Sequence, residues 1–162
     1  MKPADLLALL REFYREKALL RQRHVAGARH VSHYDFNNTY QYVINREDLQ
    51  LSWVSDAIAD LGGTAEDVPE PRVEPPGKAE DAQKAVIRDD RDAAQAFVNR
   101  WHDRVEGMTN ARNRTMLRVI LGETLEHKRF FEQALAGRED LLGRRADGAG
   151  TPGAVLPTRW VE

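Results

Sequence analysis

The stretch RVILGETLEHKRFF, residues 118–131, decides the fold class, because its apolar side chains recur with the spacing of an amphipathic helix. At about 100° per residue, Glu123 and His127 fall on the same arc as these side chains, and Glu126 falls at its edge. The apolar members of the arc are Met116, Val119, Ile120, Phe130, Phe131 and Ala134. A carboxylate inside a protein needs a cation, a proton or a hydrogen-bond network. We therefore expect other helices to direct polar groups toward Glu123 and His127.

Three further segments have helical periodicity, and almost no part of the chain alternates with period two. They span about residues 3–24, 32–61 and 78–106, and the fourth helix begins at Thr109 or Asn110 and continues to about residue 136. About fifteen proline-rich residues separate the second helix from the third, whereas the other connections are short. Short connections join antiparallel neighbours, and a long one permits a crossover. The sequence predicts an all-α, ferritin-like four-helix bundle of two antiparallel hairpins joined by a long crossover.

The end of the chain has a different composition from the helices. Residues 1–136 form the predicted bundle, and residues 137–162 form a glycine- and proline-rich flexible tail. This tail ends in four large apolar side chains, Val155, Leu156, Trp160 and Val161. An apolar cluster behind a flexible spacer is a candidate for docking on a neighbouring subunit or on another protein.

Composition limits the classes of function. The 162 residues carry a net charge of -2 and no cysteine, which excludes disulfides and thiolate metal sites. No Gly-rich phosphate loop, serine nucleophile motif or nucleic-acid module is present, and the charge balance gives no global basic field. No run of apolar residues in the sequence is long enough to span a bilayer. We expect a cytoplasmic protein with no nucleic-acid or membrane partner.

The same helical arithmetic places polar residues on the inner arcs of the other helices. Glu47 falls in the centre of the second helix's arc, and Asp90 lies among the apolar residues of the third. On the first helix the arc centres near Lys17, Glu16 lies on its flank and Glu12 lies farther out. These groups are predicted to lie near one middle layer of the bundle.

These residues and the connection lengths resemble the ferritin-like superfamily, which includes ferritins, rubrerythrins and related di-iron carboxylate proteins. The resemblance covers about residues 4–136 and rests on the topology, on Glu47 and on GETLEHKRFF. It implies a di-iron or di-manganese pair in the bundle core, with possible oxidase or peroxide chemistry. The implied metal ligands are Glu16 (or Glu12), Glu47, Asp90, Glu123, Glu126 and His127.

The chain also departs from that pattern. Gln50 stands three residues after Glu47, where the family has histidine, and His127 follows Glu123 by four residues rather than three. Lys17 projects where a cation would lie, although a lysine more often keeps its amine in water. The alternative hypothesis is therefore a metal-free structural or protein-interaction module. Its contacts would use the tail and a second apolar line on helix two, formed by Tyr42, Leu49 and Trp53, which also favours a homo-oligomer, a dimer or larger.

The remaining histidines gather mostly in the predicted corner between the first two helices. His24, His30 and His33 occur in RHVAGARHVSHYDF without a nearby second set of ligands. We expect these side chains to belong to a polar, solvated loop.

Overall fold

The computed structural model describes residues 1–143, and it contains four helices and no strand within them. The prediction of an all-α fold is confirmed. No helix of this described part is long and apolar enough to cross a membrane. The helices are α1 (Pro3–Ala28), α2 (Tyr34–Asp60), α3 (Ala79–Glu106) and α4 (Ala111–Leu135).

The helix ends follow local chemistry. The Nδ1 atom of His33 accepts a hydrogen bond from the backbone N–H of Phe36, so His33 caps α2. Asn110 caps α4 by accepting a hydrogen bond from the backbone N–H of Asn113 at 2.9 Å. The first helix ends at Ala28, four residues later than predicted, because its last turn is buried against the bundle instead of forming a loop.

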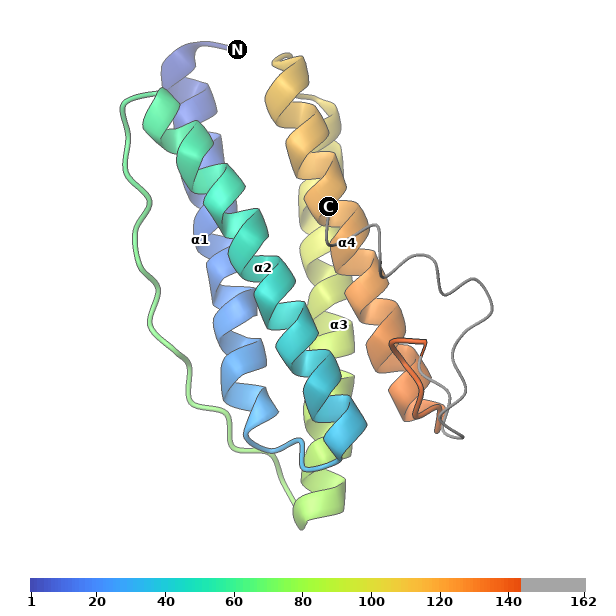
Figure 1. Cartoon of the computed structure of the whole chain (residues 1–162). Helices are drawn as coiled ribbons and strands as arrows, with labels where there is room; N and C mark the ends of the chain where they lie inside the picture. Colours follow the sequence, from blue (N-terminus) through green and yellow to red (C-terminus); the bar gives the residue numbers. More distant parts are fainter. Residues whose placement is uncertain (144–162) are drawn as a thin grey trace, which may run out of the picture.

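Residues 61–78 form the long connection, which runs along the outside of α1 from the end of α2 to the start of α3 (Figure 1). Side chains on and just after α1 hold it in place. Gln22 donates a hydrogen bond to the carbonyl of Val68 at 2.8 Å, and the Nε2 atom of His30 lies 3.0 Å from the carbonyl oxygen of Val73. Most of the predicted tail, residues 144–162, lies outside the described part of the chain.

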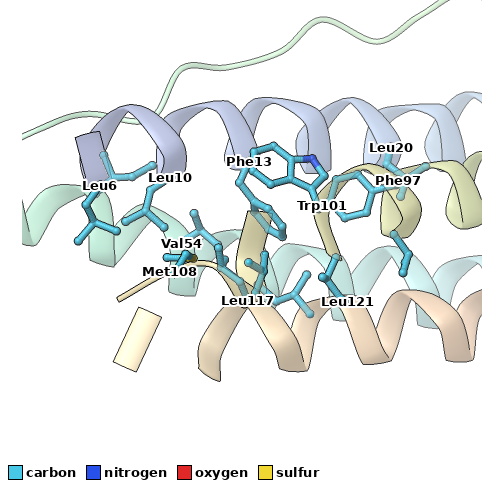
Figure 2. Close-up of a cluster of buried hydrophobic side chains, with 14 residues drawn as sticks. Leu6, Leu10, Phe13, Leu20, Val54, Phe97, Trp101, Met108, Leu117 and Leu121 are labelled. Atoms are coloured by element: carbon cyan, nitrogen blue, oxygen red, sulfur yellow. The ribbon is translucent and has the colours of Figure 1, made fainter. Parts of the chain in front are cut away.

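Two apolar clusters fill the interior. In the first, the rings of Phe13, Phe97 and Trp101 pack edge to face, with centroids 4.9 Å apart between Phe13 and Trp101 (Figure 2). The second cluster lies around Tyr40 and Phe131 and includes Leu141, just after α4. Along α2, α3 and α4, the residues between the two clusters include buried polar side chains. These polar residues are the candidate functional site.

Candidate functional site: a buried polar layer

A layer of buried polar side chains crosses the bundle between its two apolar clusters, and all four helices contribute to it. Each member exposes no more than 3% of its surface. Such burial is costly for charged groups unless each finds a partner. The members of this polar layer are Lys17 and His24 from α1, Glu47 and Gln50 from α2, Asp90 from α3, and Thr124 and His127 from α4.

An ion pair between α1 and α2 lies in the polar layer. The Nζ atom of Lys17 lies 2.9 Å from Oε2 of Glu47, and both side chains are completely buried. Lys17 also donates a hydrogen bond to the hydroxyl of Thr124 at 3.2 Å, and this hydroxyl donates to the carbonyl of Ile120 at 2.8 Å. The second carboxylate oxygen of Glu47 is hydrogen-bonded to Nδ1 of His24. The Glu47 carboxylate is therefore held by two basic groups on one helix.

These contacts determine the charge state of the carboxylate. Burial alone would raise the pKa of Glu47, but the charges of His24 and Lys17 and their hydrogen bonds outweigh it and lower the pKa to about 2. Burial lowers the pKa of His24, but the adjacent Glu47 carboxylate raises it by more, so the net shift is upward. Glu47 is thus ionised at neutral pH, with its charge compensated inside the protein.

Asp90 belongs to a separate pair in the same layer. Its Oδ2 atom accepts a hydrogen bond of 2.5 Å from the phenol of Tyr40, on α2. Burial raises the pKa of Asp90, against the opposing effects of the His24 charge and the Tyr40 hydrogen bond. Burial and the neighbouring Asp90 carboxylate raise the pKa of Tyr40 well above its usual value. The orientation predicted for Asp90 is confirmed, because only 3% of the residue is exposed.

His127 is buried and neutral. Burial, followed by the charge of Lys17, lowers its pKa to about 3. Its Nδ1 atom and the Oε1 atom of Gln50 have no hydrogen-bond partner among the described residues. The imidazole thus has one ring nitrogen in the interior without a hydrogen-bond partner.

The structure does not bring all six predicted metal ligands together. Glu47, Asp90 and His127 are in the polar layer, but the side chain of Glu123 is 26% exposed. Glu123 forms an ion pair with Arg46 and accepts a hydrogen bond from Gln50, so it closes the edge of the layer instead of lying inside it. The expectation of a fully interior Glu123 is wrong, because the buried side of α4 is centred nearer Thr124.

The other two predicted ligands also lie outside the polar layer. The side chain of Glu126 is 60% exposed and pairs with Arg129 on its own helix. Glu16 accepts a hydrogen bond from the Trp101 indole and pairs with Arg100 on α3 at 3.2 Å. Glu12, the alternative on α1, pairs with Arg104 and is exposed. These carboxylates therefore have cationic or hydrogen-bonding partners from the protein.

Two members of the polar layer were missed by reasoning from the sequence. His24 was expected in a solvated loop, but α1 continues past it and buries it against Glu47, so that expectation is wrong. Thr124 was not predicted to face the interior. It lies three residues before His127, the spacing that places two side chains on one face of a helix. Lys17 was noticed on the inner arc, and its amine is buried rather than in water.

The donor set of the polar layer does not fit a metal pair. Among residues 1–143, no group of three or more histidine, aspartate or glutamate side chains is arranged to hold a metal ion. A protonated amine cannot ligate a metal, and the Lys17 amine lies against the carboxylate that would be the central ligand. Comparison with family models, curated proteins and solved structures finds no match to this chain.

Proposed function

We propose that this chain is a metal-free bundle of the ferritin-like type that acts as a binding and assembly module. Its two hairpins would be antiparallel and joined by the long connection as a crossover. Support for this arrangement comes from the path of residues 61–78 in Figure 1 and from Gly63, just after α2, which lies against Leu7 near the start of α1. The single observation that carries the metal-free part is the buried amine of Lys17 beside Glu47.

The inner residues also support a lost metal site. In di-iron bundles, two helices each direct a Glu-x-x-His pair inward, in which the second ligand lies three positions after the first. The buried pairs at this spacing are Glu47 with Gln50 on α2, and Thr124 with His127 on α4. Each pair keeps one of the two ligand types and replaces the other with a neutral side chain. Lys17 then supplies the positive charge that Glu47 requires.

The outer surface supports the assembly part of the proposal. On α2, Tyr42 and Leu49 are 43% and 42% exposed, and Trp53 is half-buried on the same side. Apolar and aromatic side chains grouped on one helix face are typical of protein contacts. The buried charges of this bundle are paired with one another, and its surface carries a line of apolar side chains on α2. Such a bundle is suited to binding another protein.

The metal-free part is tested by measuring metal binding directly. We expect purified protein to bind no stoichiometric iron, manganese or zinc by elemental analysis, before or after anaerobic addition of each ion. The triple variant Lys17→Glu, Gln50→His, Thr124→Glu restores the two pairs and removes the amine, so it is expected to bind metal. Lys84→Glu, which makes the same charge change as Lys17→Glu at an exposed position on α3, is the control and should bind none.

Stoichiometric binding by the unaltered protein that is lost in Glu47→Gln would overturn the proposal. Binding that is lost only in Glu123→Gln would overturn it too, and would favour a metal site at the edge of the layer. Loss of folding in the triple variant is detected by circular dichroism, and in that case the decision rests on the unaltered protein.

A further inference from the structure

The face formed by α2 and α4 carries exposed apolar side chains from two neighbouring helices. α2 and α4 lie side by side in Figure 1, in front of α1 and α3. Tyr42, Leu49 and Trp53 line the α2 side, and Val119, which is 46% exposed, lies on the α4 side. A cleft of about 590 Å³ separates the two helices near Trp53 and Val119. We call this surface the α2–α4 face.

Gly122 lies at the edge of the same face, in the middle of α4, and nothing in the described chain requires it to be glycine. It is exposed, and a Cβ atom added to it would meet no heavy atom of the described residues within 4 Å. Glycine inside a helix costs about 1 kcal/mol relative to alanine. Close approach by a side chain from another molecule would give this position a reason to lack a Cβ atom.

Residues at the same height on the two helices are complementary in size and charge. Gln50 is hydrogen-bonded to Glu123, and α2 and α4 run in opposite directions, so Leu49 lies within one helical turn of the height of Gly122, a large side chain near the smallest residue. At one end of the face, Asp60 on α2 and Arg112 on α4 line the same cleft, and both are exposed. At these two heights, the residues on the α2 side therefore complement those on the α4 side in size or in charge.

We infer that a second copy of this chain covers the α2–α4 face, related by a two-fold axis parallel to the helices. Such an axis places α2 of each copy against α4 of the other copy. Rotation about it does not shift the chain along the helix direction, so residues at the same height in one copy meet across the interface. Leu49 then meets Gly122 of the partner subunit, and Asp60 meets Arg112 of the partner subunit. This inference rests on the proposed assembly function and names its partner as the chain itself.

A charge exchange tests both the partner and the direction of the axis. In Asp60→Arg the contact between positions 60 and 112 becomes cation against cation, and in Arg112→Asp it becomes anion against anion. We expect each variant alone to dissociate about 10-fold more readily by analytical ultracentrifugation, as like charges across an interface cost affinity. Mixing the two variants should restore association as a heterodimer, because both contacts are then of opposite charge.

Substitutions at Leu49 and Gly122 test the close approach. Leu49→Arg should weaken association by about 30-fold or more, the loss typical of a central apolar contact, while thermal unfolding of the diluted protein stays unchanged. Gly122→Ala should weaken association although it stabilises the helix. Leu19→Arg, at a leucine of similar exposure on α1, is the matched control and should leave association unaltered.

A protein that is monomeric at all concentrations, or whose association survives Leu49→Arg, would overturn the inference. Single charge variants that fail to recover on mixing would also overturn it, because the axis would then be different. These results are separable from failure of the metal-free proposal. A monomer without metal refutes only the dimer, and a dimer that binds metal refutes only the absence of metal.

Discussion

Replacement of Lys17 by methionine removes the amine that compensates Glu47 and keeps most of the volume of the side chain. In the unaltered protein the charges are 2.9 Å apart and completely buried. At an effective dielectric constant of about 20, two unit charges at this distance attract by about 6 kcal/mol before the cost of removing them from water. Removing one member of such a buried pair typically costs about 3–5 kcal/mol. We expect about 3 kcal/mol for Lys17→Met, since His24 still contacts the carboxylate.

The measurement is the free energy of unfolding from urea denaturation, followed by far-ultraviolet circular dichroism at neutral pH. Typical domains have about 5–15 kcal/mol of stability, so the variant should remain folded. The control is Lys128→Met, which removes a partly exposed surface lysine paired with Glu132 at 3.0 Å, one turn along α4. Exposed pairs of this kind contribute only about 0.3–0.5 kcal/mol. Lys17→Met should therefore lower the free energy of unfolding by about six times as much as Lys128→Met, or more.

The pH dependence gives a second readout for the same pair. The pKa of Glu47 is lowered from 4.5 to about 2, so its contribution to stability is present above pH 4.5 and is lost as the pH falls toward 2. Lys17→Met removes part of this contribution, so the difference between variant and unaltered protein should narrow over that window. The double variant Lys17→Met, Glu47→Met should recover part of the loss, because apolar replacement of a buried pair is often neutral, although it removes the partner of His24.

Two results would refute this reasoning. One is a cost for Lys17→Met no greater than that for Lys128→Met. The other is a double variant whose loss equals the sum of the two single losses, since that would show that Lys17 and Glu47 do not stabilise one another.

Three further changes test contacts in and around the polar layer. The pKa of His127 is lowered from 6.5 to about 3, so unfolding takes up a proton below pH 6.5. Between about pH 7 and about pH 5, the free energy of unfolding from urea titrations should fall by about 2 kcal/mol more in the unaltered protein than in His127→Gln. Equal losses would contradict a neutral buried imidazole. Tyr40→Phe leaves Asp90 without its buried donor and should cost about 1–3 kcal/mol in chemical denaturation, whereas the same change made in an Asp90→Asn background should cost less. Gly27→Ala would place a Cβ atom 2.8 Å from Cγ1 of Val86, so its melting temperature should fall, and it should recover when Val86 is shortened to alanine.

The helices were predictable because their signals are local. Periodic apolar residues, the proline in the first turn of α1 and the asparagine before α4 act within a few residues, and each helix forms close to where these signals place it. The inward position of Glu47 was predictable for the same reason. On α2 the buried residues form a single broad stripe, and Glu47 lies at its centre.

The orientation of α4 was harder to read because this helix is apolar on more than one side. Val119 belongs to the predicted arc but is 46% exposed, whereas Leu117 and Leu121, on the other side of the arc, are buried. Including Val119 shifted the predicted centre toward Glu123. The true centre lies nearer Thr124, and only the packing of α3 against α4 distinguishes the two.

The environment of His24 could not be read from its own neighbours. The residues that follow it, Val25 to Ala28, include a glycine and look like the start of a turn. They remain helical because Gly27 lies against Val86 and Tyr40 from other helices, a contact between residues far apart in the sequence. Tertiary packing of this kind outweighs local preference.

The location of the charged members of the polar layer has a consequence for synthesis on the ribosome. Lys17, His24 and Glu47 all belong to the first two helices, so an emerging chain holds both charge and countercharge before α3 is made. The later helices bring a hydroxyl, an imidazole that stays neutral and a carboxyl with its own tyrosine partner. The second half of the nascent protein therefore docks on a first half that already carries its compensating ions, and no late helix has to deliver a missing counterion.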